Sequence, residues 1–195
     1  MQRLLVVFAA LVLLPVAGVP VRAELGATPV ERVQQKHAAK LDQLFDNLKR
    51  SNSADEAKQL AKQIWSLWYE SGNDDVDLLM RQARQSFTRG QHKAAIARID
   101  QALRLEPRYA EAWNLRATIH FYMGEDEASV ADIERTLALE PRHFGALAGL
   151  MMINMRAENW SAALKSLQAA LKLHPFLNER SLLPRLEELA KGRAP

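Results

Sequence analysis

The residues that could carry out chemistry are scattered along this 195-residue chain. No two of the five histidines are three or four residues apart, the spacing that places two metal ligands on one helix face. They are His37, His92, His120, His143 and His174. The chain has no cysteine, no glycine-rich phosphate loop, no His-Glu-x-x-His pair and no serine flanked by glycines. We therefore expect no catalytic residue, no cofactor, no metal site and no enzymatic activity.

Other polar groups have structural explanations. The acids Glu125, Asp126 and Glu127 resemble the first turn of a helix, where negative charge is favourable beside the helix dipole. Asn159-Trp160-Ser161 matches a glycosylation acceptor, but its place at the start of a predicted helix favours a capping role for Asn159. We expect His120 to pack inside the protein.

Gly145 and Gly149 are the most unusual local feature, because a glycine inside a helix costs about 1 kcal/mol relative to alanine. One interpretation is close helix packing, which small residues four apart permit. The other is a depression that accepts an apolar side chain of a partner. Its walls would be Phe121, Met152 and Met155. The sequence leaves both interpretations open.

The elements that position these residues repeat along the chain. Three dipeptides that end apolar runs recur at intervals of 34 residues: Glu106-Pro107, Glu140-Pro141 and His174-Pro175. Two columns of small residues keep the same period, namely Ala95, Ser129 and Ala163, and Ala102, Thr136 and Ala170. Gly90 and Gly124 precede their prolines by 17 residues, but Glu158 occupies the third such position. We expect a different turn there, with Asn159 in the left-handed conformation.

The segment from Ala110 to Pro141 resembles the tetratricopeptide repeat (TPR). Six residues fall on the signature columns of that family: Trp113, Leu115, Ala117, Gly124, Ile133 and Pro141. The resemblance implies an all-α, right-handed superhelical solenoid of antiparallel helix pairs. Its units would be residues 74–107, 108–141 and 142–175, followed by a C-terminal capping helix in residues 176–195.

Residues 24–73 are predicted to form a helical hairpin. The first helix begins at the capping motif Thr28-Pro29 and ends at about Arg50, and the second begins at the capping box Ser53 to Glu56. Its closely spaced Trp65 and Trp68 depart from the repeat pattern. The hairpin is therefore either a degenerate repeat or a cap on the stack.

Residues 1–23 have the pattern of a cleaved signal peptide. Arg3 precedes an apolar run from Leu4 to Leu14, and a cut after Ala23 is expected. The run is short for a membrane span, so we expect no membrane insertion after cleavage and a periplasmic location. The alternatives are an extracellular location and a membrane anchor formed by an uncleaved signal. Cleavage leaves a nearly neutral chain, for which we expect no nucleic-acid binding.

The resemblance also implies a partner groove. In TPR proteins the first helix of each pair lines a concave surface that binds an extended peptide or a partner helix. The equivalent residues here are Asp77, Met80, Arg84, Phe87 and Thr88; Glu111, Asn114, Thr118, Phe121 and Tyr122; and Gly145, Ala148, Gly149, Met152, Met155 and Arg156. Peptide-carboxylate-binding TPR domains use Lys and Asn at such columns. Only Asn114 has a counterpart here, so recognition of chaperone tails is not expected.

These features predict a non-enzymatic scaffold or adaptor in the cell envelope that binds a protein or peptide partner. The alternative is a self-associating structural protein that contacts its copies through the terminal helices. We expect a monomer rather than a homo-oligomer.

Overall fold

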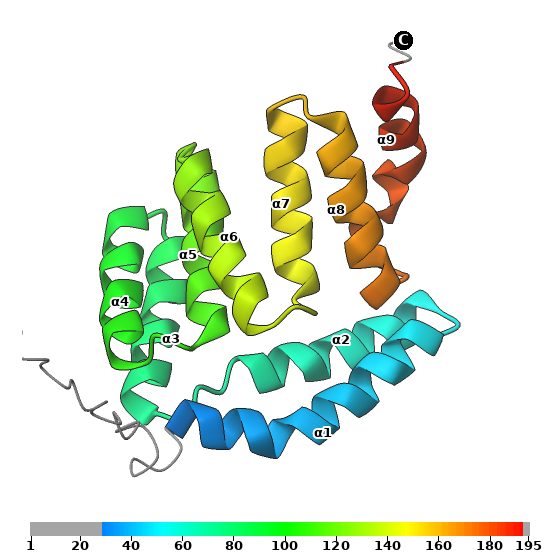
Figure 1. Ribbon diagram of the computed structural model, residues 1–195. Helices are drawn as coiled ribbons and strands as arrows, with labels where there is room; N and C mark the ends of the chain where they lie inside the picture. Colours follow the sequence, from blue (N-terminus) through cyan, green and yellow to red (C-terminus); the bar gives the residue numbers. More distant parts are fainter. Residues whose placement is uncertain (1–28, 193–195) are drawn as a thin grey trace, which may run out of the picture.

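The computed structural model describes residues 29–192, which contain helices and no strand (Figure 1). The predicted signal peptide and the Thr28 cap lie outside these residues. The helices in chain order are α1 (Pro29–Arg50), α2 (Ala54–Trp68), α3 (Asp74–Thr88), α4 (His92–Leu105), α5 (Ala110–Met123), α6 (Asp126–Leu139), α7 (Phe144–Arg156), α8 (Trp160–Leu173), the 3-10 helix η2 (Asn178–Leu182) and α9 (Leu183–Ala190). Within the described range, none is long and apolar enough to span a bilayer.

The pairs α3–α4, α5–α6 and α7–α8 pack in sequence, which confirms the predicted all-α solenoid of antiparallel helix pairs. The small-residue columns explain how the helices approach. Ala95, Ser129 and Ala163 are all buried, and the Ser129 hydroxyl donates a hydrogen bond to the Ala117 carbonyl at 2.7 Å. A larger side chain at these positions would separate the paired helices.

The turns inside the three pairs are alike, so the prediction of a different third turn is wrong. In each turn a backbone N–H binds the carbonyl five residues earlier, as from Asn159 to Asn154 at 2.8 Å. This geometry requires a left-handed residue just before the donor. Glu158 adopts it with φ of 56°, whereas Asn159 has φ of −84° and its side chain caps α8. The shared hydrogen bond therefore outweighs the cost of a left-handed Glu.

The N-terminal hairpin does not extend the stack beyond α3–α4. It crosses the ends of the repeat helices, with α2 beside the start of α7 and the end of α8 (Figure 1). Phe144, Leu173, Phe176 and Leu177 from that region share one apolar cluster with the hairpin. A longer-range hydrogen bond joins the Tyr109 hydroxyl to the Trp68 carbonyl at 3.0 Å. The hairpin thus braces the repeats along their edge, a placement that differs from both a repeat and an end cap.

The C-terminal helix α9 covers the last pair. Leu186 is fully buried and packs with Met151 and Leu167, while Leu182 and Leu183 adjoin the same cluster. The opposite side of α9, including Arg185 and Glu188, remains exposed. An amphipathic helix of this kind shields apolar surface that the last pair would otherwise leave open to water.

Candidate partner-binding surface

A depression of about 240 Å³ lies between α5 and α7, and we call the face formed by α3, α5 and α7 the first-helix face. Seven of the predicted groove residues line this depression: Asn114, Thr118, Phe121, Tyr122, Gly145, Gly149 and Met152. The sequence analysis missed Glu179 of η2, which also lines it. That residue follows the last repeat, so the repeat columns gave no signal for it.

Aromatic and sulfur-containing side chains are available on this face. Tyr122 is 66% exposed and Met152 is 40% exposed, both high values for large apolar side chains. The ring of Tyr122 contacts Phe87 at 5.4 Å and Phe121 at 5.9 Å between centroids. Arg156 covers the Phe121 ring at 3.9 Å and pairs with Asp126. The result is an aromatic ledge beside a small depression, a surface suited to apolar side chains of a partner.

Several predicted groove residues lie elsewhere. Met80 is fully buried with Val76 and Ala83 in the core between α3 and α4, so its prediction as a partner contact is wrong. Ala148 is also buried. Met155 packs near Leu186 under the C-terminal helix and is not a wall of the depression. The reason is common to all three, because the apolar character of a residue does not reveal on which side of its helix the core lies.

Other residues from that prediction make local contacts. Asp77 accepts a hydrogen bond from the Ser71 backbone at 2.9 Å, and Thr88 donates to the Gln85 carbonyl at 2.9 Å. Arg84 places its guanidinium over the Tyr69 ring at 4.7 Å, and its Nη1 is buried without a hydrogen-bond partner. Only Arg84 of these three joins the repeat helices to the end of α2.

Glu111 is buried in a polar pocket and is not a groove contact. Asn114 donates to its carboxylate at 2.9 Å, and Nε2 of the fully buried His143 lies 3.4 Å from the same oxygen. Since Nδ1 of His143 accepts the Ala146 N–H, the ring proton lies on Nε2 and faces Glu111. Burial and the nearby Glu111 charge raise the pKa values of Tyr109 and Tyr69. The buried carboxylate is thereby satisfied within the protein.

Gly145 and Gly149 have different packing roles, although both line the depression. A Cβ atom on Gly145 would lie 2.9 Å from two ring carbons of Trp65. A Cβ atom on Gly149 would lie 3.4 Å from the flexible end of Ile133. The close-packing interpretation therefore applies to Gly145, and the packed residue comes from the hairpin, 80 positions earlier in the chain. Trp65 is a residue whose role the sequence analysis missed.

These distances predict opposite effects of the same substitution. Gly145→Ala is expected to lower the free energy of unfolding by about 1 kcal/mol or more, because displacing Trp65 outweighs the gain in helix propensity. Gly149→Ala is expected to raise it by up to about 1 kcal/mol, since Ile133 can shift slightly. Urea denaturation followed by circular dichroism measures both. Equal stability of the two variants would show that Trp65 does not require the glycine.

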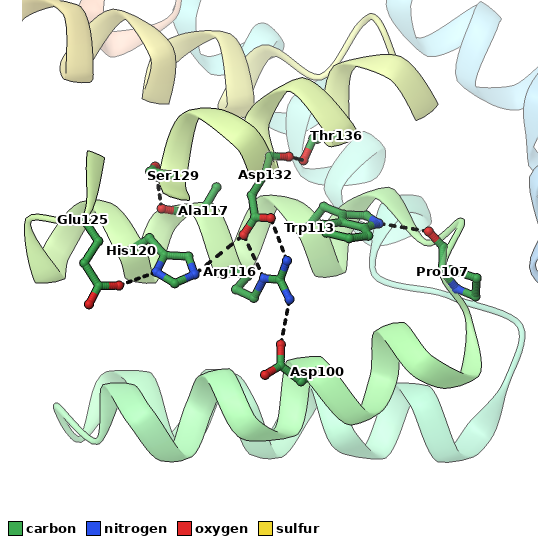
Figure 2. A network of polar contacts seen from close by, with 10 residues as sticks. All are labelled: Asp100, Pro107, Trp113, Arg116, Ala117, His120, Glu125, Ser129, Asp132 and Thr136. Atoms are coloured by element: carbon green, nitrogen blue, oxygen red, sulfur yellow. Dashed lines mark hydrogen bonds and ion pairs between the residues drawn. The ribbon is translucent and has the colours of Figure 1, made fainter. Parts of the chain in front are cut away.

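A polar network crosses α4, α5 and α6 on the side away from the depression (Figure 2). Arg116 binds both oxygens of Asp132 at 2.8 Å and reaches Asp100 at 2.7 Å. Hydrogen bonds from these two carboxylates raise the pKa of Arg116. His120 lies between Glu125 at 2.6 Å and Asp132 at 3.8 Å, so its place is this network rather than an apolar core. The network fixes neighbouring pairs relative to one another.

The network does not resemble a metal centre. Within residues 29–192 no group of three or more His, Asp and Glu side chains is arranged to hold a metal ion. Its carboxylates are engaged by Arg116 and His120, as expected for a structural ion-pair network.

The chain is similar to known repeat proteins. A TPR repeat-containing protein of Rhizobium etli is 38% identical over 171 residues, covering 84% of each chain. The TPR2B domain of yeast Sti1, in a pHsp70 complex, has a TM-score of 0.52 at 16% identity and covers 62% of this chain and 97% of its own. The TPR2AB domain of yeast Sti1, in a pHSP90 complex, has a TM-score of 0.52 at 14% identity, with coverages of 85% and 68%. No protein-family model matches the sequence.

Proposed function

Because the chain belongs to the tetratricopeptide-repeat family of protein-interaction scaffolds, we propose that it is a non-enzymatic adaptor that binds a partner segment on its first-helix face. The observation that carries this proposal is the exposure of Tyr122 and Met152 at the rim of a depression whose floor contains two glycines. Large apolar side chains grouped beside a depression are typical of protein-binding surfaces.

The dimensions of the site favour a short contact rather than a deep pocket. A volume of about 240 Å³ accommodates an apolar side chain, and the Phe87, Phe121 and Tyr122 rings extend the contact along the face. Asn114 and Thr118 line the floor, but the Asn114 amide is already bound to Glu111 and the Thr118 hydroxyl to the Asn114 carbonyl. The apolar groups therefore contribute most of the affinity, and specificity depends on shape.

We also propose that the protein works outside the cytoplasm, in the periplasm, after removal of residues 1–23. The support is the short apolar run from Leu4 to Leu14 followed by small residues before the expected cut. This proposal concerns residues outside the described range and is independent of the surface described above.

Photocrosslinking in cells tests both proposals. A crosslinking amino acid at position 122 or 152 is expected to capture a protein partner, whereas one at Leu105, which is 52% exposed on α4, is not. The captured adduct is expected in the periplasmic fraction, with a mature N-terminus near Glu24. Titration of that partner against Tyr122→Ala/Met152→Ala is expected to show at least tenfold weaker binding, about 1.4 kcal/mol.

The control is Leu105→Ala, which removes a similarly exposed apolar side chain from a second helix of a pair. It is expected to bind as tightly as the original protein. Capture at Leu105 with none at positions 122 and 152 would move the binding surface to the outer helices and would contradict the proposal. Retention of Met1 in the adduct would contradict export by a cleaved signal.

A further inference from the structure

A second hollow, of about 850 Å³, lies between α2 and the corner where α8 meets η2, and we call it the corner cleft. None of the residues that line it lines the depression on the first-helix face. The two hollows adjoin at Trp65, which lines the cleft and abuts Gly145. A volume between about 300 and 1,000 Å³ is usual for ligand sites, so the cleft has room for several side chains.

The floor of the corner cleft is aromatic. Phe144 and Trp65 meet edge to face at 5.7 Å, and Phe176 and Leu177 line the opposite side. Phe176 and Leu177 are only partly buried, as is Trp65. Part of the apolar surface therefore remains accessible to another molecule.

The third repeat differs from the second at this place in a way that forms the cleft. In the second repeat Glu140 accepts a hydrogen bond from the Arg142 side chain at 2.9 Å, beside Pro141. His174 and Phe176, 34 residues further on, replace that pair. The substitution removes an ion pair and leaves an aromatic ring and an imidazole on the surface of the cleft.

His174 is incompletely satisfied. It is 7% exposed and its Nδ1 has no hydrogen-bond partner. A buried polar atom without a partner costs about 1–3 kcal/mol. A ligand group that hydrogen-bonds to Nδ1 would recover part of that cost, and His174 lines the cleft.

The rim of the corner cleft is cationic. Lys58 and Lys62 are exposed one turn apart on α2, and neither forms an ion pair within residues 29–192. Asp55 is the single acid among the lining residues, and it lies in the first turn of α2, where the helix dipole attracts it. The charge at the rim therefore favours an anionic group beside an apolar floor.

We propose that the corner cleft binds a segment of a partner protein in which an aromatic or aliphatic residue stands next to a carboxylate. The apolar side chain packs on Phe144, Phe176 and Leu177, and the carboxylate binds Lys58 and Lys62. This contact is separate from the first-helix face and goes beyond the proposed function. It allows one adaptor to hold two segments, which raises the overall affinity through effective concentration.

A peptide selection tests the proposal. A random library of 12-residue peptides is selected on the purified full-length protein, and the most enriched peptide is labelled for fluorescence anisotropy. We expect enrichment of aromatic or aliphatic residues next to Asp or Glu. Lys58→Glu/Lys62→Glu is expected to weaken binding at least tenfold, and a peptide with Lys in place of its acids is expected to restore binding to this variant.

Lys36→Glu/Lys40→Glu is the matched control, because these exposed lysines have the same spacing on α1 and do not line the cleft. It is expected to bind within twofold of the original protein. Tyr122→Ala/Met152→Ala is also expected to bind within twofold, which separates the cleft from the first-helix face. Circular dichroism establishes that every variant is folded.

Three results would overturn the proposal. The first is a selection without an acidic and apolar motif. The second is equal affinity of the two lysine variants, or loss of binding in Tyr122→Ala/Met152→Ala, which would place the peptide on the first-helix face. The third is lysine-dependent binding to phosphatidylglycerol vesicles without any peptide binding, which would assign the cleft to a membrane surface. None of these results decides the outcome of the crosslinking at position 122.

Discussion

Phe144→Ala is expected to lower the free energy of unfolding by about 3–5 kcal/mol, the range for removal of a buried aromatic ring from a core. Phe144 is almost fully buried, and its ring contacts Phe45 and Trp68 of the hairpin and His174 of the last repeat. It is therefore the principal link between the hairpin and the third pair. Urea denaturation followed by circular dichroism measures the loss.

Hydrogen exchange adds a second readout for Phe144→Ala. Amide protection is expected to fall more in α1 and α2 than in α3 to α6, because the hairpin loses its main anchor. Tyr122→Ala is the control, since it removes an aromatic ring of similar size that is largely exposed, and its loss is expected to stay below about 1 kcal/mol. Uniform loss of protection along the chain would mean that the hairpin does not depend on Phe144.

Arg116→Ala is expected to lower the free energy of unfolding by about 2–3 kcal/mol. Removing one partner of a buried pair typically costs about 3–5 kcal/mol, and solvent reaches part of Arg116, which reduces the effect. The cost arises because the Asp132 side chain, only 6% exposed, loses both hydrogen bonds from the guanidinium. Thermal and urea melts of the same variant measure it.

The double variant Arg116→Met/Asp132→Leu separates the worth of the pair from the cost of an unpaired charge. It is expected to recover most of the stability, since apolar residues of similar volume often replace buried ion pairs without loss. Arg135→Ala is the control, because Arg135 lies over Trp113 at 6.0 Å, outside the network, and its effect is expected to stay within about 0.5 kcal/mol. A double variant less stable than Arg116→Ala would contradict this explanation.

The repeat pairs could be predicted from the sequence because their packing is local. Ala95, Ser129 and Ala163 contact a helix that is only a turn away in the chain, so a 34-residue period records each contact directly. The network around Arg116 left a similar signal that was missed. Asp100 and Asp132 are each 16 residues from Arg116, the separation that joins equivalent turns of adjacent helices.

The position of the hairpin could not be predicted in this way. Its decisive contact, between Trp65 and the bare backbone at Gly145, joins residues 80 positions apart and has no counterpart in another repeat. Burial within a helix was also ambiguous, since neighbouring methionines Met151 and Met152 have opposite environments, one fully buried and one exposed. The candidate site was therefore identified at the level of helices, and partly misassigned at the level of side chains.

The edge placement of the hairpin has a consequence for elasticity. An open solenoid behaves as a spring, because each unit contacts only its neighbours and small rotations add up along the stack. Here the Tyr109 hydrogen bond to Trp68 and the Phe144 contacts with Phe45 tie a separate strut to two successive units. The strut opposes changes in pitch, so the curvature is preset before any partner arrives. Binding then loses little configurational entropy, and partners of a different curvature are rejected by geometry alone.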